Sequence, residues 1–194
     1  MILRKASRKA IKYACMKFHY AETVPIVAIA YSVFNKKNEW CGVITFGYGA
    51  NCYLGKSYDL QQGQFLELTR MALNGKQEST SKAMSIAMRL VKKNCPTVKL
   101  LISYADKGQN HYGTIYQATN WFFVDESESS GIEGFYKGKW RHDRFASSLT
   151  KEQKARIKWR KKSGKRKYIF PLDKKLLPLC QSLSKKFPKK CSKT

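Results

Sequence analysis

Apolar residues recur at two different spacings along this chain and so predict both helices and strands. From residue 5 to 18 they fall every three or four positions, which predicts an amphipathic helix with its lysines and arginines facing solvent. Residues 1–4 indicate a short strand before it. Residues 26–34 and 40–48 are β-rich runs joined by a polar turn of Asn and Lys, which predicts a hairpin.

The middle of the chain predicts a strand, a helix and a second, parallel strand. Residues 64–73 alternate as a strand does, with successive side chains on opposite faces. Ser81 is the expected N-cap of a helix over 82–93. The apolar run that follows predicts a buried strand over 98–104, and a crossover of this length favours parallel pairing.

The last third of the chain predicts shorter elements. Thr150 is the expected cap of a basic helix, with Glu152 and Gln153 in its first turn. An acidic loop is expected over 125–133. The other predicted elements are strands at 122–124, 135–140 and 167–172, and helices at 150–162 and 176–183.

Polar residues are densest directly behind the buried strand. The stretch 103–121, SYADKGQNHYGTIYQATNW, holds an aspartate, a histidine, three tyrosines and two glycines. A rigid strand that runs into a polar, glycine-containing loop and a short helix is where α/β proteins place chemistry. We therefore expect the functional site here.

Charge is distributed unevenly around this centre. The formal charge is +25, yet residues 18–150 carry fifteen basic and eleven acidic residues, a net of only +4. Residues 1–17 hold six basic residues and no acid, and residues 151–194 hold seventeen against two. Basic flanks interleaved with aromatic residues suit a nucleic-acid backbone; a solvated basic surface or attraction to anionic lipid is the alternative.

Several classes of protein are disfavoured. A composition that is 43% hydrophobic argues against global disorder, and 194 residues suffice for one domain. The six cysteines form no CxxC pair, so neither a zinc ribbon nor a dense disulfide framework is indicated. The apolar run 24–33 is too short to span a bilayer and no signal peptide is visible, so we expect a cytoplasmic protein without a membrane partner.

Taken in order, the motifs of the chain resemble the Mom family of phage DNA-modification proteins, on a GNAT acyltransferase-like fold. The stretch 103–121 is the most specific of them. The others are His19-Tyr20, ITFGYGA (44–50), ELTRMAL (67–73), STSKAMSIA (79–87), RHDR (141–144) and KYIFPLDKK (167–175).

This resemblance implies an α/β fold with a mixed central sheet, two splayed parallel strands and flanking helices. It implies a catalytic domain over 1–149 and a basic C-terminal extension over 150–194 that packs on it and contacts DNA. The implied reaction adds an acetamido (carbamoylmethyl) group to N6 of adenine in phage DNA, which protects it from restriction in the bacterial host cytoplasm. Double-stranded DNA is the implied partner, and the oligomeric state, monomer or dimer, stays open.

The resemblance also implies an acyl-CoA cofactor such as acetyl-CoA. The usual Gln/Arg-x-x-Gly-x-Gly/Ala loop for its pyrophosphate is replaced here by NGKQESTSK (74–82), although a helix N-terminus still favours anions. The residues expected to bind the cofactor are Met71, Leu73, Lys76, Thr80, Ser81 and Lys82.

Six residues are implied for catalysis. Tyr116 is expected either to protonate the departing thiolate or to stack on Trp121 in the core. Ser103 is expected to orient substrate or to act as a nucleophile, and Glu67 is one candidate base. The remaining three are His19, Tyr20 and Asp106.

His19 and Tyr20 are expected on the acceptor side of the splay, or else as a helix cap and a half-buried ring. Asp106 is compatible with a general base, a metal ligand or a turn-fixing acceptor. With His19 and His111 it would form a mixed nitrogen and oxygen site suited to iron. Tyr48 and Tyr53, in the glycine-containing loop 47–55, are expected to wall the base pocket.

Two rival functions remain open at this point. One is a GNAT N-acetyltransferase that acts on RNA or protein. The other is a non-catalytic basic protein that binds nucleic acid.

Overall fold

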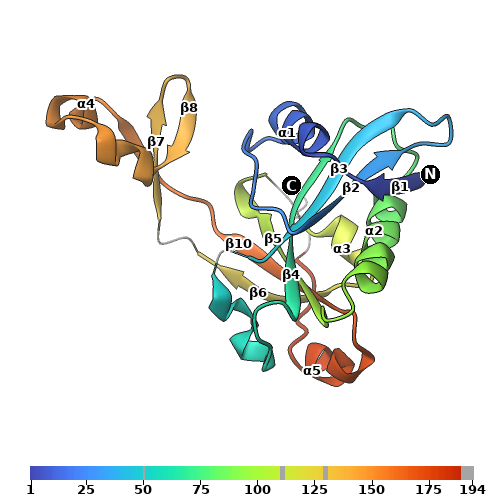
Figure 1. The fold of residues 1–194 in the computed structure, drawn as a ribbon. Helices are drawn as coiled ribbons and strands as arrows, with labels where there is room; N and C mark the ends of the chain where they lie inside the picture. Colours follow the sequence, from blue (N-terminus) through green and yellow to red (C-terminus); the bar gives the residue numbers. More distant parts are fainter. Residues whose placement is uncertain (50, 110–111, 129–130, 189–194) are drawn as a thin grey trace, which may run out of the picture.

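The computed structural model describes residues 1–49, 51–109, 112–128 and 131–188 (Figure 1). A seven-stranded sheet forms the body, in the order β1-β2-β3-β4-β5-β10-β6. Its strands are β1 (Ile2–Lys5), β2 (Ile29–Phe34), β3 (Trp40–Gly47), β4 (Phe65–Leu73), β5 (Leu100–Asp106), β6 (Phe122–Ser127) and β10 (Lys165–Pro171).

Helices cover both faces of this sheet. The α-helices are α1 (Arg8–Lys17), α2 (Thr80–Asn94), α3 (Thr114–Gln117), α4 (Lys151–Ala155) and α5 (Leu177–Ser182). Neighbouring residues of β3 point to opposite faces, and Val43 packs with α1 whereas Ile44 packs with α2. A 3-10 segment, η1 (Cys52–Tyr58), and α5 extend the α1 face over β4, β5 and β10. The predicted α/β class is therefore confirmed.

The predicted splay is also present. β4 and β5 are the parallel pair of the sheet, and they pair only from Phe65 opposite Leu100 to Leu68 opposite Ser103. Beyond these residues β4 continues along β3 and β5 along β10. A register shift between β3 and β4 leaves Thr69 as a bulge at the point of separation. A wedge-shaped opening thus begins beside Leu68 and Ser103.

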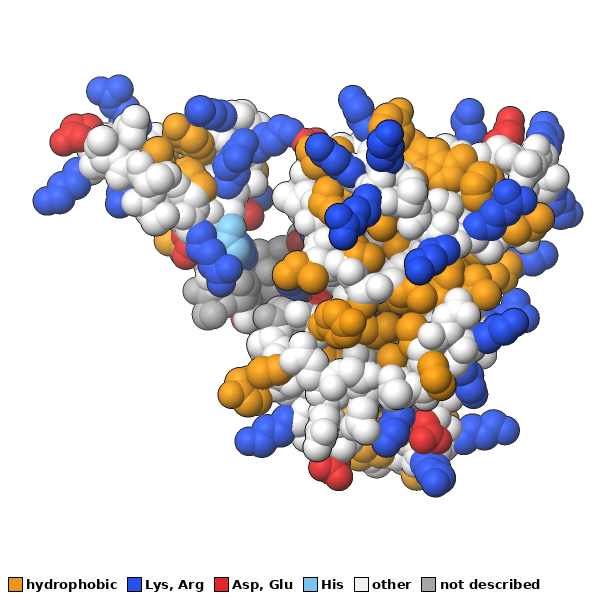
Figure 2. Space-filling model, in the orientation of Figure 1, with side chains coloured by type: hydrophobic (Ala, Val, Ile, Leu, Met, Phe, Trp, Pro, Cys, Tyr) orange, Lys and Arg blue, Asp and Glu red, His pale blue; other side chains and the backbone are white. Residues whose placement is uncertain are grey.

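A second, smaller sheet is inserted between β6 and β10. It has the order β8-β7-β9, with β7 (Ile132–Tyr136), β8 (Lys139–His142) and β9 (Lys158–Lys161). We call residues 131–163 the arm, because they project from the body in Figure 1. The arm carries eleven lysines and arginines against three acids, and basic side chains cover much of it in Figure 2.

Three predictions for the arm region are wrong. The single strand expected at 135–140 is a hairpin, because Lys137 and Gly138 have left-handed φ angles of 49° and 75° that reverse the chain. The helix expected over 150–162 ends at Ala155, since the following residues pair with β7 as β9. The acidic loop expected over 125–133 is mostly strand, because β6 pairs with β10 as far as Ser127.

The start of the crossover helix also needs correction. α2 begins at Thr80, and the Ser79 hydroxyl, not that of Ser81, accepts the cap hydrogen bond from the Lys82 amide. The first helix, the hairpin β2–β3, β10 and the parallel crossover lie where the sequence predicts them.

Two further features concern the C-terminal part. The predicted boundary between residues 149 and 150 falls inside the arm, and β10 lies between β5 and β6 in the main sheet.

Over the described residues, none of the helices has the length and apolar character that a bilayer crossing requires.

Candidate active site

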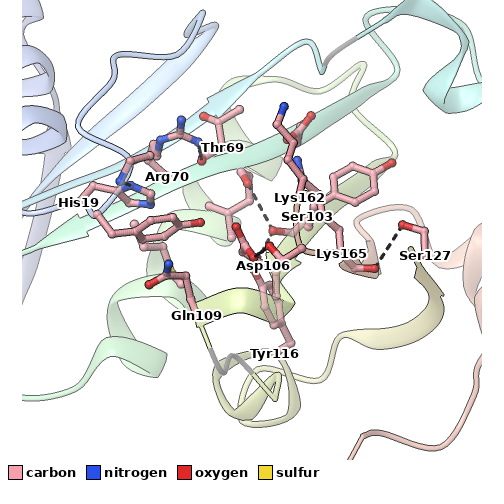
Figure 3. A pocket seen from close by; sticks show the side chains of 18 of the residues that line it. His19, Thr69, Arg70, Ser103, Asp106, Gln109, Tyr116, Ser127, Lys162 and Lys165 are labelled. Carbon is pink, nitrogen blue, oxygen red and sulfur yellow. Dashed lines mark hydrogen bonds between the residues drawn. The ribbon is translucent and has the colours of Figure 1, made fainter. Parts of the chain in front are cut away.

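A cleft of about 920 Å³ opens where β4 and β5 separate (Figure 3). Its walls are the loop after α1 (18–21), the central part of β4 (67–71) and the end of β5 (103–106). Tyr116 of α3 and several arm residues complete it. All six residues predicted for catalysis line this one cleft, although they come from four separate segments of the chain.

Ser103 and Tyr116 form the base of the cleft. Their hydroxyl oxygens are 2.8 Å apart, and the Ser103 hydroxyl also lies 3.3 Å from the Leu68 carbonyl oxygen across the splay. Ser103 is almost fully buried. A serine held in this way orients the tyrosine hydroxyl. Its predicted roles, orientation of the substrate or nucleophilic attack, stay predictions.

The ring of Tyr116 is locked by its neighbours. It stacks on Tyr168 of β10 with the ring centroids 4.1 Å apart and the planes 8° from parallel, and it meets the edge of Trp121 at 5.4 Å. Burial raises the pKa of Tyr116 to about 12, against the hydrogen bond with Ser103, which lowers it. The phenol therefore keeps its proton at neutral pH, and stacking in the core and proton donation are compatible roles.

A glycine with a left-handed backbone conformation allows this stack of tyrosine rings to form. Gly113 caps α3 with φ 83°, and a Cβ atom there would lie 2.3 Å from the Tyr168 hydroxyl oxygen. Only glycine combines this backbone conformation with so close an approach. The glycine in the central motif thus holds α3, and with it Tyr116, against β10.

His19 faces the splay from the loop after α1 (Figure 3), and Tyr20 lines the same cleft. Their rings stack with centroids 4.4 Å apart. The His19 Nδ1 atom accepts a hydrogen bond from the Ala21 amide at 3.1 Å, which leaves Nε2 as the protonated nitrogen of a neutral ring. Burial raises the pKa of Tyr20, and the Asp106 carboxylate raises it further.

Asp106, the last residue of β5, is tied to both its own turn and the arm. Its Oδ1 atom accepts hydrogen bonds from the Gly108 amide, at 2.8 Å, and from the Ser163 hydroxyl. The turn-fixing role considered for Asp106 is thus present. Since the side chain also lines the cleft, that role leaves its carboxylate beside Tyr20.

Glu67 lies on β4 on the opposite side of the cleft from Asp106. It faces the tyrosines, because its charge contributes to raising the pKa of both Tyr104 and Tyr116. Two carboxylates, Glu67 and Asp106, therefore line the same cleft as the Ser103–Tyr116 pair, from different strands.

Arg70 is a cleft residue that the sequence patterns did not single out. Its guanidinium donates to the Thr69 carbonyl oxygen at 2.7 Å and to the Thr23 hydroxyl at 3.2 Å. Its buried Nε atom has no hydrogen-bond partner within the described part of the chain. A second charged residue, besides Glu67, within the predicted strand 64–73 was the signal available in the sequence.

The arm forms the remaining wall of the cleft. Glu133, His142, Lys162 and Ser163 line it from this side, followed by Lys165 at the start of β10. The sequence analysis placed Glu133 in the acidic loop, His142 in the RHDR motif, and Lys162, Ser163 and Lys165 in the basic flank, so their position at the site was missed. Only the pairing of β7, β8 and β9 brings them beside β5.

Comparison with known proteins decides which family has this arrangement. The model of the Mom protein family matches residues 1–189. The chain belongs to the Mom family. Within it, the methylcarbamoylase mom of Escherichia phage Mu is 32% identical over 106 residues, which span 53% of this chain and 43% of the Mu protein. The aligned part is thus less than half the length of that relative.

Solved structures show the fold of this Mom-family protein. A spermidine N-acetyltransferase chimera from Vibrio cholerae and hSSAT is 6% identical with a TM-score of 0.53, over 88% of this chain and 95% of the other. A protein assigned as a phosphinothricin N-acetyltransferase is 9% identical with a TM-score of 0.54, over 89% of this chain and 99% of the other. A GNAT-family protein from Chromobacterium violaceum is 8% identical with a TM-score of 0.51, over 88% of this chain and 82% of the other. The predicted GNAT-like fold is confirmed.

The residues predicted to bind acyl-CoA lie along one route in this Mom-family fold. Met71 lines the cleft and Leu73 ends β4. Lys76 lies in the loop before α2, and Thr80, Ser81 and Lys82 lie in the first turn of that helix. The Thr80 hydroxyl accepts from the Gln77 side chain and the Ser81 hydroxyl bonds that of Ser79. The route runs from the splay to a helix N-terminus, and the binding itself stays a prediction.

The metal prediction gains no support in this Mom-family structure. His111 lies outside the described residues, and the described part of the chain holds no group of three or more His, Cys, Asp or Glu side chains arranged to bind a metal ion. His19 and Asp106 do line the same cleft.

The predicted pocket wall in the loop 47–55 is wrong. Tyr48 and Tyr53 are exposed, and neither lines the cleft. The loop leads into η1 (Cys52–Tyr58), whose Tyr58 packs under the sheet with Phe65 and Leu100. Apolar packing on the α1 face, which the sequence did not show, accounts for this segment.

Proposed function

We propose that this protein transfers a methylcarbamoyl (acetamido) group to the N6 amino group of adenine in double-stranded DNA of its phage. Membership of the Mom family supports this, as does the similarity to the Mu protein named as a methylcarbamoylase. The observation that carries the proposal is the Ser103–Tyr116 pair at the point where β4 and β5 separate, in a cleft that two carboxylates also line.

Tyr116 is suited to give a proton to a leaving group. Burial raises its pKa to about 12, so the hydroxyl is neutral, and Ser103 holds it at 2.8 Å. A positioned acid of this kind contributes about a hundredfold or more to a reaction rate. The proton passes from the Tyr116 oxygen atom to the leaving group as the bond between the leaving group and the transferred group breaks.

A base is needed to take the proton from the adenine amine as the new bond forms. Glu67 and Asp106 both line the cleft that holds the Ser103–Tyr116 pair. Asp106 lies beside Tyr20 and His19, whose stacked rings offer a flat surface for an adenine ring. We assign the base role to Asp106 and the orientation of the acceptor base to His19 and Tyr20.

The shape of the sheet fits an acyl-CoA as the donor. Since β4 has no β5 partner after Leu68, its edge can receive an extended chain, and the bulge at Thr69 widens the opening. The start of α2, capped by Ser79, follows the end of β4 and suits a pyrophosphate. Bound there, acyl-CoA would supply the two transferred carbons and release the CoA thiol. Acyl transfer alone would join N6 to the carbonyl carbon, so the acetamido product, joined to N6 through CH2, also requires an amide-nitrogen donor and a two-electron oxidant as co-reactants.

The size of the cleft suits a base that has left the double helix. Cavities that enclose ligands typically measure roughly 300–1,000 Å³, and this one is about 920 Å³. The N6 amine is inside the base stack in duplex DNA, so adenine must be turned out at a cost on the order of a few kcal/mol. Binding of the phosphate backbone by lysines and arginines would offset that cost.

Mass spectrometry of nucleosides tests this proposal. DNA from cells that express the protein is expected to contain an adenine nucleoside heavier by an acetamido group, and DNA from cells that express Tyr116→Phe is expected to lack it. An acetylated RNA or protein with unmodified DNA would show a different acceptor, that of an ordinary N-acetyltransferase. Unmodified DNA, RNA and protein together would show a non-catalytic binding protein.

A further inference from the structure

The two faces of the arm sheet differ in how they are covered. Residues paired across neighbouring strands share a face, so Gly134, Arg141 and Trp159 lie on one side of the sheet. On that side Phe145 stacks between Tyr136 and Trp159, and Ile157 is buried against Gly134. This face holds the small core of the arm.

The other face, which we call the open face, carries Glu133, Phe135, Trp140, His142, Lys158 and Arg160. Phe135 and Trp140 are 43% and 37% exposed, and their rings lie 5.4 Å apart. The Arg160 guanidinium lies 3.9 Å above the Trp140 ring and bonds Glu133 at 2.6 Å. The face thus offers stacked aromatic and cationic groups to solvent.

The open face is continuous with the cleft. Glu133 and His142 belong to both, so the surface runs from the Ser103–Tyr116 pair outward to Trp140. Figure 2 shows the molecule hollowed between the arm and the body. A substrate that extends beyond the cleft on this side must therefore pass along the open face.

Two contacts hold the arm in place relative to the cleft. At its base, the Ser163 hydroxyl donates to Asp106 of β5. At the β7–β8 turn, Lys139 forms an ion pair with Glu22, in the loop that carries His19 and Tyr20. Both contacts join the arm to segments that line the cleft, so the open face has a defined position beside the site.

Charge and aromatic content together indicate what the open face binds. The arm has a net charge of +8, from eleven basic and three acidic residues. Cations alone are typical of a solvated surface, but exposed aromatic rings beside them are typical of a surface that also contacts bases or sugars. A bilayer surface would require a broad apolar face, whereas Phe135 and Trp140 are surrounded by charged side chains.

We infer that the open face of the arm holds double-stranded DNA beside the cleft, with Lys158 and Arg160 on phosphates and the Trp140 ring against the nucleotide next to the extruded base. This rests on the proposed function and adds to it the surface that binds the substrate. It also divides the basic C-terminal region, since residues of β9 contact DNA whereas β10 belongs to the main sheet.

Binding of a fluorescent DNA duplex at several salt concentrations tests this inference. The charge variant is Lys158→Ala with Arg160→Gln, in which the glutamine still offers Glu133 a donor. Its matched control is Lys92→Ala with Lys93→Ala, which removes two charges from the last turn of α2, on the far side of the body from the arm (Figure 1). Trp140→Ala, with Trp140→Phe as its conservative partner, tests the aromatic contact.

The charge variant is expected to bind about tenfold more weakly, and the slope of log K against log salt is expected to fall by about 1 to 2, since each phosphate contact contributes about 0.9. Trp140→Ala is expected to bind about tenfold more weakly with an unchanged slope, because stacking does not release counterions. Trp140→Phe and the α2 control are expected to bind as the unchanged protein does. Circular dichroism confirms that each variant is folded.

Other results would overturn the inference separately from the proposed function. If the unchanged protein modifies adenine in DNA while the charge variant and Trp140→Ala bind DNA normally, the function stands and the role of the arm does not. Preferential binding of single-stranded RNA over duplex DNA would overturn the assignment of the partner. Absence of both DNA binding and an adenine product would overturn the function and the inference together.

Discussion

The hydroxyl groups of Ser103 and Tyr116 lie 2.8 Å apart and connect the end of β5 to α3 at the base of the splay. Tyr116 in turn stacks on Tyr168 of the neighbouring strand β10 at a centroid distance of 4.1 Å. The two stacked tyrosines differ in the hydrogen bonding of their hydroxyl groups. The Tyr116 hydroxyl bonds Ser103, whereas the buried Tyr168 hydroxyl has no hydrogen-bond partner among the residues that the structure describes.

Tyr116→Phe is expected to lower the rate of DNA modification by about a hundredfold or more, because it removes the proposed acid and leaves the ring in place. The loss in the free energy of unfolding is expected to be about 1 kcal/mol, the contribution of one hydrogen bond. Tyr168→Phe is the matched control and is expected to keep full activity and equal or higher stability. Equal activity of both variants would remove Tyr116 from the mechanism. Nucleoside analysis and urea unfolding provide the two measurements.

Asp106→Asn separates the charge of the proposed base from its structural role. The amide oxygen can still accept from Ser163 and Gly108, so the free energy of unfolding is expected to change by less than about 1 kcal/mol. The modification rate is expected to fall by about a hundredfold or more. Glu67→Gln is the matched comparison, and a larger loss of rate there would move the base role to Glu67. The pKa of Tyr20 is expected to fall in Asp106→Asn, since the carboxylate raises it.

Ser163→Ala tests the contact between the arm and the active site. A hydrogen bond to a carboxylate contributes about 1.5–3 kcal/mol, so we expect about a tenfold loss in kcat/KM for DNA through poorer positioning of Asp106. Ser147→Ala is the control, because its hydroxyl bonds the Arg144 carbonyl within the arm. If the two variants have equal kcat/KM, the Ser163 contact does not position the site.

Gly113→Ala is expected to destabilise the fold more than Gly75→Ala. The two glycines have nearly the same φ, 83° and 85°, so each substitution costs about 1–2 kcal/mol of backbone strain. A Cβ atom at Gly75 meets nothing within 4 Å, whereas at Gly113 it lies 2.3 Å from the Tyr168 hydroxyl and adds about 1–3 kcal/mol of overpacking. Thermal unfolding measures the difference, at about 2–4 °C per kcal/mol. Equal melting temperatures would show that α3 moves away without cost.

Stability is expected to decrease above about pH 10. Burial raises the pKa of Tyr104, Tyr116 and Tyr168 to about 12 in the folded state, while the unfolded chain releases these protons near pH 10. Over this interval the folded state binds more protons than the unfolded state, so unfolding becomes easier as pH rises. Urea unfolding from pH 8 to 11 measures the slope. Tyr168→Phe, which removes one of these groups, is expected to flatten it, and an unchanged slope would contradict the assignment.

The local pattern of the sequence was sufficient for the elements of the body. Spacing of apolar residues predicts α1, the β2–β3 hairpin, and the β4–α2–β5 crossover, because each depends on contacts near in the chain. The secondary structure of the arm was mispredicted, since a basic amphipathic run such as 150–162 has no strong preference of its own for helix or strand. Pairing with β7, more than twenty residues earlier, turns its second half into strand β9.

The candidate site divides in the same way. The resemblance to the Mom family indicated His19, Tyr20, Glu67, Ser103, Asp106 and Tyr116, and all six line one cleft. Lys162 and Ser163 were missed, because what distinguishes them is their position in space and not the sequence around them. Arg70 was missed although a charged residue on a predicted strand was a signal in the sequence.

The sequence by itself determined the α/β class, the family motifs and the concentration of positive charge outside the centre of the chain. These properties depend on residue type and on spacings of a few residues. Only the tertiary structure decided that β4 and β5 separate after Leu68 and Ser103, that Tyr116 meets Ser103 there, and that the basic arm walls the cleft. Each depends on register and packing between distant segments, which no local pattern specifies.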